Sequence, residues 1–136
     1  MIGHSSLEAA RLAGITFRQL DYWVRVGSVE PAYPARGSGS HRRWSDVDVD
    51  CLLILGRVCR LLGDMDHELS WALWTWLQEH KVWPTTLPVG RDSRGRWMAG
   101  SYGVAQAGLL LTLAGTSRAA AAPGDGEQLT LTPRAV

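Results

Sequence analysis

Apolar residues recur every three to four positions through roughly the first eighty residues of the chain, a spacing that predicts amphipathic helices. We expect these helices at about 6–13, 16–26, 46–62 and 66–80. The first begins within Ser5-Ser6-Leu7-Glu8, where a serine and the glutamate three residues later fit a capping box. Gly14 and Gly27 stand where the first two helices should end.

Only Ala13, Gly14 and Ile15 separate the first two helices, and two short helices joined by a glycine-containing turn are typical of a helix-turn-helix. After Gly27, two short extended segments flank a loop rich in glycine and serine, which predicts a β-hairpin. A hairpin in this position is a wing. The predicted fold class is therefore mainly α, with a winged helix-turn-helix domain.

The second half of the chain has a different pattern. Pro84 and Pro88 end the helical region. We expect strands at about 85–89, 96–99 and 109–113, with a short helical stretch near 102–107. The chain then divides into a winged helix-turn-helix domain at 1–63, a tryptophan-rich helix at 64–81, a small β-rich appendage at 82–114 and a flexible tail at 115–136.

The helix at 16–26 has two contrasting faces. Its apolar face carries Phe17, Leu20, Trp23 and Val24, and its polar face carries Arg18, Tyr22 and Arg25, with Gln19 beside them. A guanidinium matches phosphate or guanine, a glutamine matches adenine, and a phenol can reach a phosphate. The pattern alone also fits a solvated helix face, so both interpretations stay open.

The hairpin tip is basic, with Arg36, His41, Arg42 and Arg43 around Gly37 and Gly39. Glycines let a backbone approach a ligand closely, and arginines neutralise phosphates. A solvated loop is the simpler alternative. Together the helix and the hairpin give a set of candidate DNA-binding residues: Thr16, Arg18, Gln19, Tyr22, Arg25, Arg36, His41, Arg42 and Arg43.

Residues 14–27, the hairpin end His41-Arg42-Arg43-Trp44 and the following Ser45-Asp46-Val47-Asp48-Val49 resemble the winged-helix domain of MerR-family transcriptional regulators, most closely an actinobacterial and phage-like subgroup. The resemblance covers residues 6–70. It implies a recognition helix at 16–26 that enters the major groove and a wing that grips the adjacent backbone.

The resemblance also assigns individual roles. Tyr22 looks like an aromatic that contacts the DNA backbone, Arg42 and Arg43 look like wing contacts to phosphate, and Trp44 looks like a packing residue. One position departs from the family, because Asp21 stands where many members have an arginine. An aspartate there would repel phosphate, and Arg18 on the same face can take over that contact.

Composition narrows the function class. The chain has 136 residues, 46% of them apolar, and a net charge of +1, so any contact with nucleic acid depends on local charge. Cys51 and Cys59 lie two helical turns apart and do not converge on one metal ion, and Asp46, Asp48 and Asp50 fit a solvated first turn, so we expect no metal site. We expect no enzymatic activity, no cofactor, no signal peptide and no membrane span, which places the protein in the cytoplasm at the nucleoid.

Two surfaces leave their role open. The helix at 66–80 is apolar around most of its circumference, through Trp71, Trp74, Trp76 and the leucines between them, and needs cover either from residues beyond 82 or from a dimer partner. Asp92-Ser93-Arg94-Gly95 predicts a turn between the strands at 85–89 and 96–99. Arg91, Arg94 and Arg96 near this turn form either a further DNA contact or a solvated hairpin, and we favour the latter.

The function predicted from these features is sequence-specific transcriptional regulation through double-stranded DNA, by a homodimer on a two-part site and with RNA polymerase as a further partner. A phage excisionase-like or architectural DNA-binding factor is the first alternative. A protein-interaction adaptor that uses the tryptophan-rich helix is the second.

Overall fold

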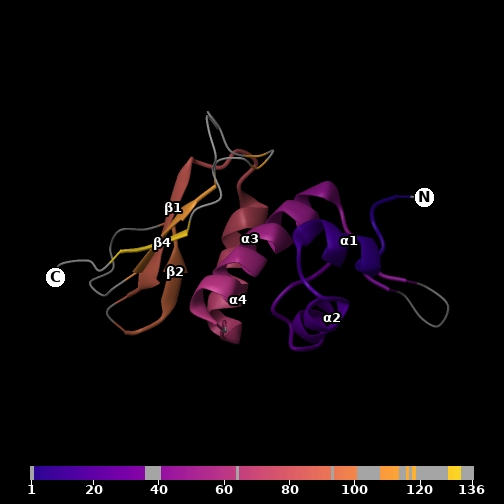
Figure 1. Cartoon of the computed structure of the whole chain (residues 1–136), viewed down its shortest axis with the longest axis horizontal. Coiled ribbons are helices and arrows are strands. Elements are labelled where there is room, and N and C mark those ends of the chain that lie inside the picture. The colour runs from indigo at the N-terminus through magenta and orange to yellow at the C-terminus, as the bar shows by residue number, and fades with distance from the viewer. Residues whose placement is uncertain are drawn as a thin grey trace.

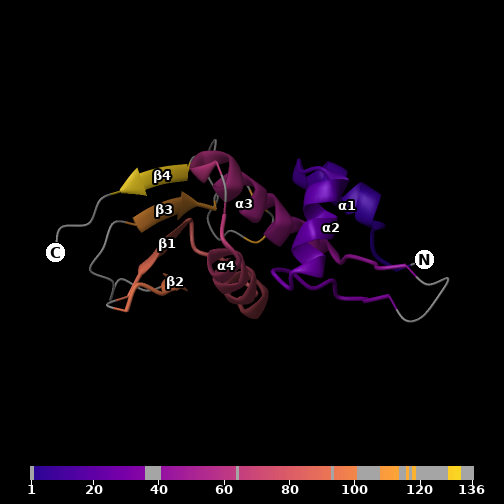
Figure 2. The same ribbon diagram turned by 90° about the horizontal axis from the view of Figure 1, so that it is seen from below.

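A computed structural model describes residues 2–35, 41–63, 65–92, 94–100, 108–113, 116, 118 and 129–132. The elements are α1 (Ser6–Ala13), α2 (Phe17–Arg25), α3 (Asp46–Leu62), α4 (His67–Glu79), β1 (Thr86–Arg91), β2 (Trp97–Ala99), β3 (Gly108–Thr112) and β4 (Leu129–Thr132). Helices α1 and α2 lie at one end of the molecule and the β-sheet at the other, with α3 and α4 between them (Figures 1 and 2).

The four helices begin where local hydrogen bonding predicts. The side chains of Ser5, Thr16, Ser45 and Asp66 each accept a hydrogen bond from a backbone N–H in the first turn of their helix. At α3 the capping box is complete, because the Asp48 carboxylate also accepts a hydrogen bond from the Ser45 N–H. The predicted bounds of all four helices are thus confirmed to within one residue.

The turn between α1 and α2 depends on glycine twice. Gly14 ends α1 with a φ of 74°, a left-handed conformation that glycine adopts without strain. Gly56 lies on α3 where the turn packs against it, and a Cβ at that position would sit 2.8 Å from the Ile15 Cγ2 atom. Because the turn lies so close to α3, the direction in which α2 leaves the turn is fixed.

Asp48 differs from its prediction as a solvated residue of the first turn of α3. It is 2% exposed, and its carboxylate accepts hydrogen bonds from the N–H of Ala32 at 2.8 Å and from Gln78 Nε2 at 2.7 Å, besides the N–H of Ser45. The sequence pattern shows the acid at the helix start but not these distant donors. Asp48 therefore joins α3 to the segment after α2 and to α4.

The sheet is antiparallel, with strand order β2-β1-β3-β4. Strands were expected near β1, β2 and β3, whereas β4 lies in the segment predicted to be a flexible tail. The helical stretch predicted near 102–107 falls outside the described residues. One side of α4 packs on α3 and another on β2, so residues beyond 82 cover part of its apolar surface (Figure 1). Trp71 remains 44% exposed.

The turn between β1 and β2 is organised by Asp92. Its carboxylate accepts hydrogen bonds from the backbone N–H groups of Arg94 and Arg96 and pairs with the Arg96 guanidinium. These contacts, above all the one from the Arg96 N–H, hold the pKa of Asp92 below its usual range. Arg91 lies over the Trp97 ring at 4.7 Å. The side chains of Arg91 and Arg96 thus have partners within the hairpin formed by β1 and β2.

A short N-terminal arm pairs with the chain just before α3. His4 and Trp44 exchange backbone hydrogen bonds of 2.7 and 2.8 Å. The His4 ring lies between two carboxylates, with Nδ1 2.5 Å from Glu8 Oε1 and Nε2 2.6 Å from Asp46 Oδ1. Both ring nitrogens must carry a proton to donate these two bonds, so the geometry favours the imidazolium form. The contact with Asp46, followed by that with Glu8, raises the pKa of His4 above 6.5.

Stability should therefore depend on pH through His4. Because its pKa is raised in the folded state, the stabilisation is fully present below about pH 6.5 and is lost as the pH rises through the higher folded value. Urea unfolding from neutral to mildly alkaline pH should show a decline in the free energy of unfolding. The His4→Asn variant should lack this decline, and an unchanged slope in that variant would refute the assignment.

Within the described residues, no helix is long and apolar enough to cross a membrane, and no three His, Cys, Asp or Glu side chains gather closely enough to hold a metal ion. Both cysteines are free thiols. Cys51 is buried, and burial raises the pKa of its thiol. Cys59 is half-buried on α3.

Candidate nucleic-acid interface

The α2 helix packs one face on the core and leaves the other in solvent. Leu20 and Trp23 are buried at 1% and 4% exposure, whereas Arg18, Tyr22 and Arg25 are exposed. Arg18 makes no hydrogen bond or ion pair with any residue in the described ranges. The Arg25 guanidinium lies 5.9 Å from the centre of the Tyr22 ring, so these two side chains sit together on the exposed face.

Asp21, the position that departs from the MerR pattern, contacts two arginines. Its carboxylate lies 3.1 Å from Arg25 Nε in the same helix and 3.1 Å from Arg42 Nη1 in the hairpin. The Arg42 contact is the main cause of the lowered pKa of Asp21. The negative charge is thus offset locally, and the same contact ties α2 to the hairpin.

The chain segments 31–35 and 41–44, which we call the hairpin segment, pair at one point. Tyr33 and Arg43 exchange backbone hydrogen bonds of 3.1 and 2.8 Å. Arg36 lies outside the described residues. The Arg43 guanidinium donates to the carbonyl oxygens of Ile2 at 3.0 Å and Gly3 at 2.7 Å. Arg43, predicted to contact phosphate, thus has a structural contact with the N-terminal arm.

Two further predicted site residues have contacts inside the domain. The Thr16 hydroxyl caps α2 by accepting from the Gln19 N–H at 3.0 Å. The Gln19 side chain turns towards α3, where Nε2 donates to Cys59 Sγ at 3.2 Å. Gln19 lies at the edge of the polar face, where α3 can reach it, and its contact with DNA stays a prediction.

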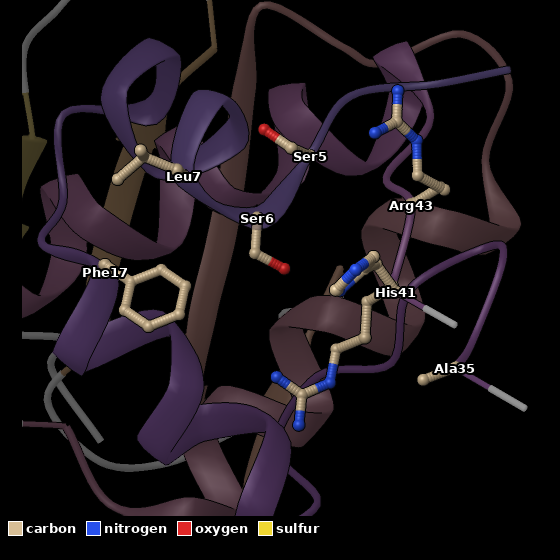
Figure 3. Close-up of a pocket in the computed structure, with 8 residues that line it drawn as sticks. Ser5, Ser6, Leu7, Phe17, Ala35, His41 and Arg43 are labelled. Carbon is tan, nitrogen blue, oxygen red and sulfur yellow. The ribbon is translucent and has the colours of Figure 1, made fainter. Parts of the chain in front are cut away.

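A hollow opens between the helices and the hairpin segment, with a cavity volume of about 710 Å³ (Figure 3). Leu7 of α1 and Phe17 of α2 lie on one side of it, and His41 and Arg43 on the other (Figure 3). Arg42, Ala35, Ser5 and Ser6 complete the lining. Phe17 belongs to the predicted apolar face of its helix, yet it is 49% exposed, and Leu7 is 69% exposed.

Comparison with known proteins agrees with this geometry. The model of the MerR helix-turn-helix regulatory protein family matches residues 5–62, which include α1, the turn, α2, the hairpin segment and α3. Residues 5–62 are a MerR-family helix-turn-helix domain. The resemblance noted from the sequence is thereby confirmed for this part of the chain.

The MerR domain also matches curated relatives, which are named as uncharacterized HTH-type transcriptional regulators. They come from Mycobacterium bovis and from two strains of Mycobacterium tuberculosis, and each is 44% identical over 59 residues. The match covers 43% of this chain and 26% of each relative, so the chain matches these relatives over about a quarter of their length.

Three residues of the candidate site, Asp21, Phe17 and Leu7, were not among the residues predicted from the sequence. The sequence pattern presents Asp21 as a charge that repels phosphate, Phe17 as part of the apolar face of its helix, and Leu7 only as part of a helix cap. The signal that could have found Asp21 is its i, i+4 spacing to Arg25, a common helix ion pair. For Phe17 and Leu7 no sequence signal separates an exposed apolar residue from a buried one at the edge of an amphipathic face.

Proposed function

We propose that the MerR domain binds specific DNA sequences and regulates transcription, with α2 in the major groove and the hairpin segment as a wing on the backbone. One observation carries the proposal. Arg18, Tyr22 and Arg25 are exposed on α2, while the Asp21–Arg42 contact of 3.1 Å holds the hairpin segment beside the same helix. The family match and the names of the relatives support it.

The chemistry follows from the side chains. Arg18 is the base-reading candidate, because a guanidinium can donate two hydrogen bonds to guanine. The Tyr22 hydroxyl, Arg25, Arg42 and His41 are the phosphate candidates, and the two arginine charges would displace counterions from the duplex. Affinity should therefore fall steeply as salt concentration rises.

The proposal is tested by selecting DNA from a random pool with the purified protein and titrating the selected site by gel shift. Arg18→Ala should weaken binding to the selected site by about 1–3 kcal/mol and leave binding to random DNA nearly unchanged. Arg42→Ala should weaken both and reduce the salt slope by about one, because it removes a phosphate contact and leaves Arg25 as the remaining partner of the Asp21 charge.

Arg94→Ala is the matched control, since it removes the same charge from the exposed turn between β1 and β2. It should leave both affinities unchanged, and a loss as large as that of Arg18→Ala would instead assign this turn to the interface. Failure of the pool to yield any enriched sequence would count against sequence-specific binding. Homodimer formation, contact with RNA polymerase, DNA bending by an architectural factor and an adaptor role for α4 stay predictions.

A further inference from the structure

An exposed aromatic residue begins the helix that we propose as the recognition helix. Phe17 is the first residue of α2 and is 49% exposed, although Leu20 and Trp23 on the same helix are buried. Leu7, 69% exposed, lies beside it in the hollow. Covering exposed apolar surface with a ligand lowers the free energy of the system. Phe17 and Leu7 therefore mark a contact surface.

The surroundings of this apolar pair are basic. His41, Arg42 and Arg43 line the other side of the same hollow. The centres of protein–protein interfaces are depleted of charged residues, whereas an apolar contact flanked by cations suits a polyanion that also carries apolar groups. Duplex DNA has this chemistry, with phosphates along the strand and methyl groups in the major groove.

Thymine is the base whose major-groove edge carries a methyl group, at C5, and phenylalanine is among the side chains that contact it. The N-terminal residues of a recognition helix are those that approach base edges. We propose that Phe17 is a specificity-determining residue that contacts the C5-methyl group of a thymine and so selects a T·A pair in the bound site. This inference rests on the proposed function, and Leu7 extends the apolar surface beside it.

The test uses the full chain and the DNA sequence that it enriches from a random pool. Each thymine of that sequence is replaced in turn by deoxyuridine, which lacks only the methyl group. With the wild-type protein, one replacement should weaken binding by about fourfold, the effect of losing one buried methyl-sized group. Phe17→Ala should bind the unsubstituted site about as weakly as the wild-type protein binds the deoxyuridine site. The same deoxyuridine should then cause no further loss of affinity in Phe17→Ala.

The controls separate this contact from other causes. Leu12→Ala removes another exposed leucine, on α1 and outside the hollow, and should keep the full response to deoxyuridine. If thermal melting shows that Phe17→Ala does not fold, Phe17→Gln takes its place, because glutamine favours a helix and offers no apolar contact.

Three results would overturn the inference. In the first, the enriched site shows no response to any deoxyuridine. In the second, Phe17→Ala responds to deoxyuridine as the wild type does. In the third, the response disappears in Leu7→Ala but persists in Phe17→Ala. Each of these leaves the proposed function intact, whereas a pool that yields no enriched sequence removes the proposed function and this inference together.

Discussion

Trp44→Ala should lower the free energy of unfolding by about 3–5 kcal/mol, the range for removing a large aromatic side chain from a core. Trp44 is the last residue of the hairpin segment and is fully buried. Its Nε1–H donates to Ser6 Oγ at 2.9 Å, and its ring meets the Trp74 ring edge-on with centroids 6.4 Å apart. The substitution leaves a cavity between α1 and α4 that the surrounding helices can fill only in part. Urea unfolding measures the loss.

Trp71→Ala is the matched control, because it removes the same side chain from α4 at a position that is 44% exposed. It should cost much less than Trp44→Ala. Trp44→Phe should fall between the two, since it keeps part of the packing and loses the hydrogen bond to Ser6. Equal losses for Trp44→Ala and Trp71→Ala would show that Trp44 does not hold the helices together as described.

Asp48→Ala should have the second large effect on stability. The backbone N–H groups of Ala32 and Ser45 and the side-chain amide of Gln78 all donate to this buried carboxylate. Each buried donor left without an acceptor costs about 1–3 kcal/mol, so the loss should reach about 3 kcal/mol or more. The free energy of unfolding from urea titration again gives the measurement.

Glu30→Ala serves as the control for Asp48→Ala, because Glu30 is an exposed acid close in sequence to Ala32. Its removal should change stability by less than about 0.5 kcal/mol. A second variant, Gln78→Ala, should lose part of what Asp48→Ala loses, since it removes one of the three donors. If Asp48→Ala proved as mild as Glu30→Ala, the role of Asp48 in joining α3 to α4 would be wrong.

The helices of this chain could be predicted closely because their start signals are local. Ser5, Thr16, Ser45 and Asp66 each cap a helix through atoms within the first turn, and such contacts depend on a few neighbouring residues. The packing of Trp44, which the family resemblance implied, is confirmed by its complete burial. Strands β1 and β2 followed from the turn signal between them, and β3 followed from its run of leucines.

The candidate site could be predicted only in part. Periodicity placed Arg18, Tyr22 and Arg25 on one exposed face, but the partners of other residues come from distant parts of the chain. Gln19 meets Cys59 forty residues later, and Arg43 meets Gly3 forty residues earlier. Such contacts depend on how the helices pack against one another, and the periodicity of apolar residues within one helix carries no information about that packing. Strand β4 was missed because the alanine run and the turn cluster at 119–126 favoured a flexible tail, although Leu-Thr-Leu-Thr alternates as a strand does.

The pairing of β4 with β3 has a consequence for how separate molecules of this protein behave. Strand β3 is an inner strand because Leu129–Thr132 lie beside it, and its own sequence, Gly-Leu-Leu-Leu-Thr, is almost wholly apolar. Without those last paired residues, β3 would present an open row of backbone donors and acceptors, the template on which chains assemble into aggregates. With β4 in place, the open edge belongs instead to a strand of four residues that alternates leucine with threonine, which is a shorter and less apolar template for such pairing.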